Sequence, residues 1–72
     1  MEAGLAAVAA ALAVGLTAFG TAYAQGRIGA AGAGAIAERP EVAPAVIIMV
    51  AIPETMIILG FVVAALILFG QR

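Results

Sequence analysis

The sequence contains no cysteine, histidine or tryptophan, and it carries few charges for its length. Without cysteine the chain has no disulfide, no thiol nucleophile and no cysteine-ligated metal site. Without histidine it lacks the commonest general base and metal ligand of enzymes. Four acidic and three basic residues leave a formal net charge of −1, which does not favour nucleic acid as a partner. We therefore expect neither catalysis by this chain nor a resident cofactor.

Apolar residues are what the sequence has in excess, at 67% of 72 residues. A soluble domain this short must bury a core and still cover it with polar side chains. With only 10% of its residues charged, the chain cannot cover such a surface. The composition predicts an integral membrane protein.

Two long apolar stretches remain between the charges, from Ala3 to Ala24 and from Pro44 to Gly70, and only Glu54 interrupts the second. A membrane-spanning helix requires roughly 20 apolar residues, so both stretches qualify. The segment from Glu38 to Pro44 contains two prolines and three charges, which is typical of a short polar turn. We predict an all-α fold, a transmembrane two-helix hairpin in one unit, residues 1–72. The predicted boundaries are helix 3–37, polar turn 38–44 and helix 45–70.

A short turn between two spans leaves both termini on one side of the membrane. Arg27 and Arg39 lie toward the turn, whereas Arg72 lies at the far end. The positive-inside rule then predicts a cytoplasmic turn. A cleaved signal peptide is the alternative for the first span, because Ala22-Tyr23-Ala24 resembles a cleavage site. The basic n-region is missing and the apolar stretch is too long for an h-region, which favours a retained helix.

The first helix carries its bulk on one stripe and small residues elsewhere. Steps of three and four residues bring the bulky side chains onto one side; they are Leu5, Val8, Leu12, Leu16, Phe19 and Tyr23. Two ridges of small residues, Gly20 with Ala24 and Ala22 with Gly26, lie about 200° apart around the helix. Small residues let helices approach closely in lipid. Close-packing surfaces on opposite sides favour a closed ring of identical copies, although richness in Ala and Gly can also reflect composition alone.

In such a ring the bulky stripe would face the lumen. Arg27 lies near that stripe, so it would stand at the cytoplasmic mouth of the lumen and contact lipid headgroups. Simple snorkelling of the guanidinium to the membrane interface explains Arg27 equally well.

Glu54 is the most informative residue, because apolar residues flank it on both sides and it cannot reach an interface. A charged side chain at mid-membrane costs roughly 2.5 to 3.5 kcal/mol on insertion scales. Acidic residues in this position mark ion pathways by default, and we interpret Glu54 as an ion carrier. A structural polar contact between helices is the alternative.

The residues around Glu54 support an ion site. Pro53 has no N–H and leaves the carbonyl of Met49 without its helical partner, which in lipid must be satisfied in another way. Thr55 adds a hydroxyl, and Gln25 is an uncharged polar side chain at similar depth on the first helix. We expect Gln25, Glu54 and Thr55 to converge.

These features together resemble the proteolipid family of rotary ATPases, which comprises the c subunit of F-type enzymes and the two-helix c or K subunit of V/A-type enzymes. The resemblance covers the whole chain. The run Gly20-Thr21-Ala22-Tyr23-Ala24-Gln25-Gly26 matches the family's alternating glycines, with two alanines in their place, and the turn Glu38-Arg39-Pro40-Glu41 is similar to the family's turn. Pro53-Glu54-Thr55 followed by Gly60 looks most like the V/A-type version.

The resemblance implies a rotor ring that couples ion flow to ATP synthesis or hydrolysis. It implies that the turn, with Arg39, Pro40 and Glu41, binds the central stalk. It also implies that Glu54 carries H⁺ or Na⁺ past an arginine of a stator a-type subunit. Identical copies, the stator, the central stalk and membrane lipids are thus the expected partners.

The transported ion is a choice between H⁺ and Na⁺. By resemblance, Gln25, Glu54 and Thr55 occupy the positions that bind Na⁺ in sodium-driven members, but Leu59 and Met56 replace oxygen-bearing positions. With the Ile52 carbonyl, the chain offers few oxygens for a hard cation. We therefore predict H⁺, with Na⁺ as the alternative. Half of a small proton-coupled antiporter is a third hypothesis, which the scarcity of aromatic residues disfavours.

Overall fold

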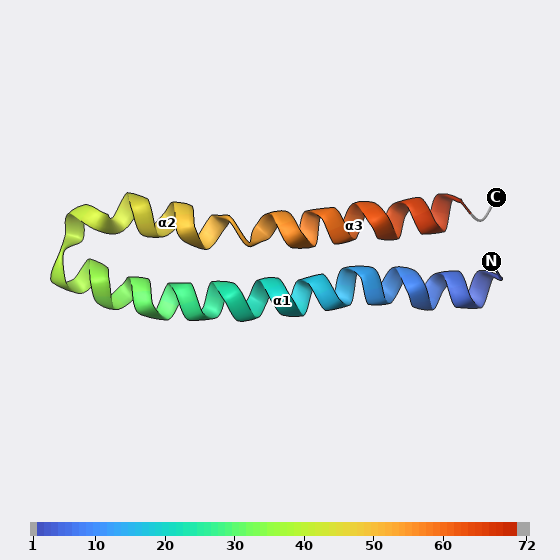
Figure 1. Ribbon diagram of the computed structural model, residues 1–72, viewed down its shortest axis with the longest axis horizontal. Helices are drawn as coiled ribbons and strands as arrows, with labels where there is room; N and C mark the ends of the chain where they lie inside the picture. The colour runs from blue at the N-terminus through green and yellow to red at the C-terminus, as the bar shows by residue number, and fades with distance from the viewer. Residues whose placement is uncertain (1, 71–72) are drawn as a thin grey trace.

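The computed structural model describes residues 2–70 and forms a long antiparallel hairpin (Figure 1). The first arm is α1, Ala3–Glu38, and the second arm comprises α2, Ala43–Ala51, and α3, Glu54–Phe69. A short 3₁₀ turn, η1, Pro40–Val42, joins the arms. The hairpin measures 54 × 15 × 7 Å, and the start of α1 lies beside the end of α3 (Figure 1). The all-α two-helix hairpin predicted from the sequence is confirmed.

The reversal of the chain is fixed by the residues around Pro40. A residue before proline avoids the helical region, and Arg39 adopts an extended backbone with φ −140° and ψ 88°. Its N–H still donates to the carbonyl oxygen of Ala35 at 2.8 Å, which closes the last turn of α1. Pro40 then begins η1 at a position where no N–H is required.

The second arm begins two residues before the predicted residue 45. Pro44 accounts for the difference: it occupies the first turn of α2, where its missing N–H is not needed, so the helix starts at Ala43. The predicted single helix is also interrupted between Ala51 and Glu54. Since Pro53 cannot donate to the carbonyl four residues earlier, tighter bonds replace the helical ones: Thr55 N to Ile52 O and Met56 N to Pro53 O, each 3.1 Å.

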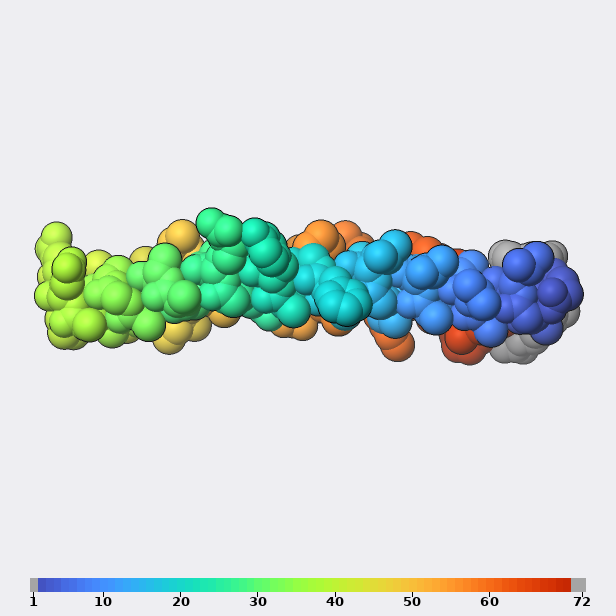
Figure 2. All heavy atoms as spheres, turned by 90° about the horizontal axis from the view of Figure 1, so that it is seen from below, coloured from blue at the N-terminus to red at the C-terminus, as the bar shows by residue number. Residues whose placement is uncertain are grey.

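The two arms meet through small residues. Within residues 2–70 the buried positions hold no large side chain; they are Ala6, Ala10, Thr21, Gly32, Gly60 and Ala64. The bulky stripe of α1 faces away from the second arm and is exposed. Figure 2 shows this outer side of α1, with the second arm visible only at its margins. The hairpin therefore has almost no internal core, and most of its apolar surface is open to its surroundings.

Both arms are long and apolar enough to cross a membrane. At about 1.5 Å per residue, the 36 residues of α1 exceed the roughly 30 Å hydrocarbon core of a bilayer. Glu54 begins α3 about halfway along the second arm, so it lies far from both ends of the hairpin.

Candidate functional site

Glu54 stands at the break in the second arm. It is the first residue of α3 and directly follows Pro53. Its side chain is exposed in the single hairpin and borders a shallow apolar depression, lined also by Val14, Ile57, Ile58 and Phe61. Of the four acidic residues, only Glu54 lies away from the chain ends and the turn. The carboxylate is thus presented from an otherwise apolar surface.

Gln25 on α1 connects Glu54 to the first arm. Its Nε2 donates to Glu54 Oε2 at 3.0 Å and to the carbonyl oxygen of Val50 at 3.1 Å. A backbone carbonyl only accepts hydrogen bonds, so the amide must turn its nitrogen toward the second arm. The structure therefore brings together Gln25 and Glu54, as expected from the sequence, and adds Val50 as a partner.

Thr55 has a different partner from the one expected. Its Oγ1 donates to the carbonyl oxygen of Ile52 at 3.0 Å, and its backbone N–H donates to the same oxygen at 3.1 Å. That carbonyl oxygen has two lone pairs, so both are occupied. Of the three polar side chains expected to converge, Gln25 and Glu54 bond to each other, while Thr55 caps the break beside them.

Thr21 is a part of this region that sequence reasoning missed. It is a buried polar residue with 4% of its surface exposed, and its Oγ1 donates to the carbonyl oxygen of Pro53 at 3.0 Å. The available signal is its spacing, because Thr21 lies one helical turn before Gln25 and on the same face. Its place in the small-residue run suggests only a spacer between Gly20 and Ala22.

The four ring-packing candidates lie in different surroundings. Gly20 is half-buried at the edge of the arm contact, where an added Cβ would stand 3.1 Å from Cε of Met56. Ala24 is also half-buried. Ala22 and Gly26 are exposed, and an added Cβ at Gly26 would meet nothing within 4 Å. One ridge thus borders the second arm and the other is open.

The turn residues lie at the far end of the hairpin from the chain ends. Arg39 Nε and Glu41 Oε2 form an ion pair at 3.0 Å, with side chains 72% and 62% exposed. Such an exposed pair contributes little to stability, about 0–1 kcal/mol. Pro40 lies between them and is exposed as well. The turn therefore presents a charged surface that is open to a partner.

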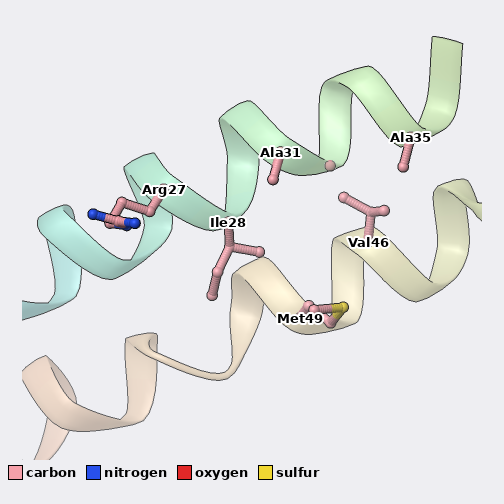
Figure 3. A pocket seen from close by; sticks show the side chains of 7 residues that line it. Arg27, Ile28, Ala31, Ala35, Val46 and Met49 are labelled. Atoms are coloured by element: carbon pink, nitrogen blue, oxygen red, sulfur yellow. The ribbon is translucent and has the colours of Figure 1, made fainter.

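Arg27 lies on the side of α1 away from Glu54. Its Nη1 donates to the hydroxyl of Tyr23 at 2.9 Å, and its guanidinium carbon lies 5.5 Å from the centre of that ring. It also stands at one end of a groove of about 430 Å³ between α1 and α2. Figure 3 shows Ile28 and Val46 pointing across this groove from opposite arms. Arg72, the other basic residue used to orient the chain, lies outside the described residues.

Comparisons with known proteins agree with this architecture. The model of the family of ATP synthase C subunits matches residues 8–67. The K subunit of the A-type ATP synthase of Methanocaldococcus jannaschii is 46% identical over 65 residues, which is 90% of this chain and 30% of that protein. The chain thus spans about a third of the length of this curated relative. Two apolar arms and a family match over most of the sequence identify an integral membrane protein. The chain belongs to the family of ATP synthase C subunits.

Proposed function

We propose that this chain is the ion-carrying subunit of the rotor ring of a rotary ATP synthase or ATPase. Its own part would be ion transport, with ATP synthesis or hydrolysis carried out by other subunits. The observation that supports this role is Glu54, a lone carboxylate halfway along an apolar arm, bound by Gln25 at a proline break. Membership of the family of ATP synthase C subunits adds support from the sequence.

The proposed cycle follows from the cost of charge in lipid. A charged side chain at mid-membrane costs roughly 2.5 to 3.5 kcal/mol on insertion scales, so Glu54 must be loaded and neutral while it faces lipid. A stator arginine would pair with the unloaded carboxylate and stabilise its charged form. Moving one charge across the membrane is worth about 2.3 kcal/mol per 100 mV, and rotation of the ring would convert this free energy.

The donor geometry favours H⁺ as the carried ion. A hard cation needs several oxygen ligands, but Gln25 directs its Nε2 at the carboxylate, and the Ile52 oxygen already accepts two hydrogen bonds. The other side-chain oxygens near the break belong to Glu54 and to Thr21 and Thr55, whose hydroxyls already donate to backbone carbonyls. A protonated Glu54 needs only hydrogen-bond partners. Na⁺ is the alternative load, held by Gln25, Glu54 and Thr55 after rotation of the amide and the hydroxyl.

The proposed partners follow the surfaces of the hairpin. Identical copies would pack along α1 into a closed ring, with the ridge of Ala22 and Gly26 open to a neighbour. The stator would meet Glu54, and the central stalk would bind the turn at Arg39, Pro40 and Glu41. Lipid would cover the bulky stripe, and its headgroups would contact Arg27. We propose a cytoplasmic turn with both termini on the opposite side, because Arg27 and Arg39 lie toward the turn.

The test is the Glu54→Gln variant in membrane vesicles. We expect it to abolish ion flux while the assembly keeps its mass in detergent, because Gln fills the same volume but cannot be loaded and unloaded. Glu38→Gln, at the exposed end of α1, is the matched control and should transport normally. Sustained flux through Glu54→Gln would refute the proposed function. An assembly with the mass of a dimer instead of a ring would favour the antiporter.

A second measurement distinguishes the two ions. A carbodiimide attacks protonated carboxyls, so it should label Glu54 alone among the four acidic residues, and labelling should weaken as pH rises. Protection of Glu54 by millimolar Na⁺ at constant pH would replace the H⁺ proposal with the Na⁺ one. Unchanged labelling in Na⁺ would support H⁺.

A further inference from the structure

Two threonines one turn apart on α1 use their hydroxyls differently. Thr17 bonds within its own helix, donating to the carbonyl oxygens of Ala13 at 2.8 Å and Val14 at 3.0 Å. This back-bonding is the usual local solution for a helical threonine. Thr21 is buried and instead donates across the arms to Pro53 O at 3.0 Å. Thr21, which departs from this usual pattern, lies opposite the proline break.

The acceptor of Thr21 shares a rigid unit with Glu54. The peptide bond is planar, so the carbonyl oxygen of Pro53 and the Cα of Glu54 lie in one plane. A hydrogen bond to that oxygen therefore restrains the position from which the Glu54 side chain departs. Met56 N donates to the same oxygen at 3.1 Å, and the two donors together satisfy both lone pairs.

Gln25 binds Glu54 at its carboxylate, the end of the residue opposite its peptide bond with Pro53. It donates to Glu54 Oε2 at 3.0 Å and also to Val50 O, which precedes the break. Thr21 and Gln25 are one turn apart on α1, and their acceptors Val50 and Pro53 are one turn apart on the second arm. Hydrogen-bond donors of the first arm thus bind a carbonyl before the break, that of Val50, and the carbonyl of Pro53 itself.

We propose that Thr21 is a positioning residue for the ion carrier: through Pro53 O it sets the orientation of Glu54, so that the carboxylate reaches Gln25. The inference rests on the proposed function of Glu54 and assigns a role to a residue that touches neither the carboxylate nor the ion. Within residues 2–70, the hydrogen bonds between α1 and the tight turn around Pro53 come from Thr21 and Gln25, so loss of the Thr21 bond leaves those of Gln25. The carboxylate then spends less of its time on Gln25.

The experiment compares Thr21→Val, which keeps the branched shape and loses the hydroxyl, with Thr21→Ser, which keeps the hydroxyl. A net hydrogen bond of typical strength corresponds to about a fivefold change in population. We expect Thr21→Val to lower ion flux in vesicles by about fivefold and to speed carbodiimide labelling of Glu54 at fixed pH. Thr21→Ser should stay within about twofold of the unchanged chain. Thr17→Val is the matched control, because it removes a hydroxyl that does not cross between the arms.

A spectroscopic measurement separates positioning from general stability. In the assembled ring, with ¹³C at the Pro53 carbonyl and ¹⁵N at the Gln25 amide, both signals should move in Thr21→Val and stay in Thr17→Val and Thr21→Ser. If Thr21→Val hinders assembly, Thr21→Ala gives the same comparison, because alanine lacks the hydroxyl and adds no new group. Unmoved signals, or unchanged labelling and flux, would overturn the inference. Glu54→Gln tests the function separately: if it abolishes flux while Thr21→Val behaves normally, only the role of Thr21 is wrong.

Discussion

Gly60→Ala tests whether close approach of the arms holds the hairpin together. Gly60 is buried in α3, and an added Cβ would lie 2.7 Å from the carbonyl oxygen of Ala13 and 2.8 Å from Cγ2 of Thr17. It would also strike Oγ1 of Thr17. The Ala13 oxygen belongs to the backbone of α1 and cannot rotate away. The arms must therefore move apart along α3 to accept one methyl group.

The expected size of the effect comes from two opposing terms. Replacing glycine by alanine inside a helix gains about 1 kcal/mol of helix propensity. Overpacking a tight contact costs about 1–3 kcal/mol. Gly34→Ala isolates the first term, because an added Cβ there meets nothing within 4 Å. We expect the association of the arms to be weaker in Gly60→Ala than in Gly34→Ala by about 1–3 kcal/mol.

The absence of cysteine makes the assay direct. Cysteines introduced at Ala3 and Gly70, where the arms end side by side, can carry a nitroxide pair, and dilution with unlabelled protein isolates single hairpins. A denaturing detergent is titrated in, and the fraction with the short distance gives the free energy of association. Thr17→Ala added to Gly60→Ala should recover part of the loss, because only the clash with Ala13 remains. Equal stability of the Gly60→Ala and Gly34→Ala variants would refute the close-contact reasoning.

The remaining predictions concern assembly and coupling. Gly26→Leu should prevent ring formation by holding neighbouring backbones apart, whereas Gly34→Leu, which lies outside both ridges of small residues, should not. The mass of the detergent-solubilised assembly decides, and rings of normal mass from Gly26→Leu would contradict the packing surface. Gly20→Leu should disturb the hairpin as well, since an added Cβ already approaches Met56. Arg39→Ala combined with Glu41→Ala should leave the ring intact and uncouple ion flux from ATP turnover in vesicles. Unchanged coupling would show that these turn residues do not bind the central stalk.

Much of the hairpin could be predicted because its determinants are local. Apolar length sets the two spans, and Pro40 with its neighbouring charges sets the turn. The missing N–H of Pro53 was also visible in the sequence. The way in which the backbone adapts to this missing N–H could not be predicted, because a proline can either kink a helix or shift it into tighter turns. Here i to i−3 bonds reach the carbonyls of Ile52 and Pro53. Donors from α1 reach those of Val50 and Pro53, and these bonds depend on the register of the arms.

Some residues of the functional site could likewise be predicted from the sequence, and others could not. Glu54 could be found from its isolation among apolar residues, and Gln25 from being an uncharged polar side chain at similar depth on the other arm. Whether the Thr55 hydroxyl turns to Glu54 or to its own helix depends on one rotamer, and both choices are common for threonine. Thr21 could not be found in this way, because a small hydroxyl inside an Ala-Gly run indicates packing. Its partner Pro53 O is 32 residues away in sequence.

The arrangement separates two tasks between the arms. Thr21 and Gln25 of α1 direct their donors at the carbonyls around Pro53 and at one oxygen of Glu54, so the first arm acts as a scaffold. Glu54 itself keeps an open side toward the apolar depression that Ile57 and Phe61 help to line. In the proposed function, the load would enter and leave from that side, because Gln25 contacts the carboxylate from the other. In the proposed ring, loading and unloading would therefore depend on what faces the depression: lipid would retain the proton, and a stator arginine would release it.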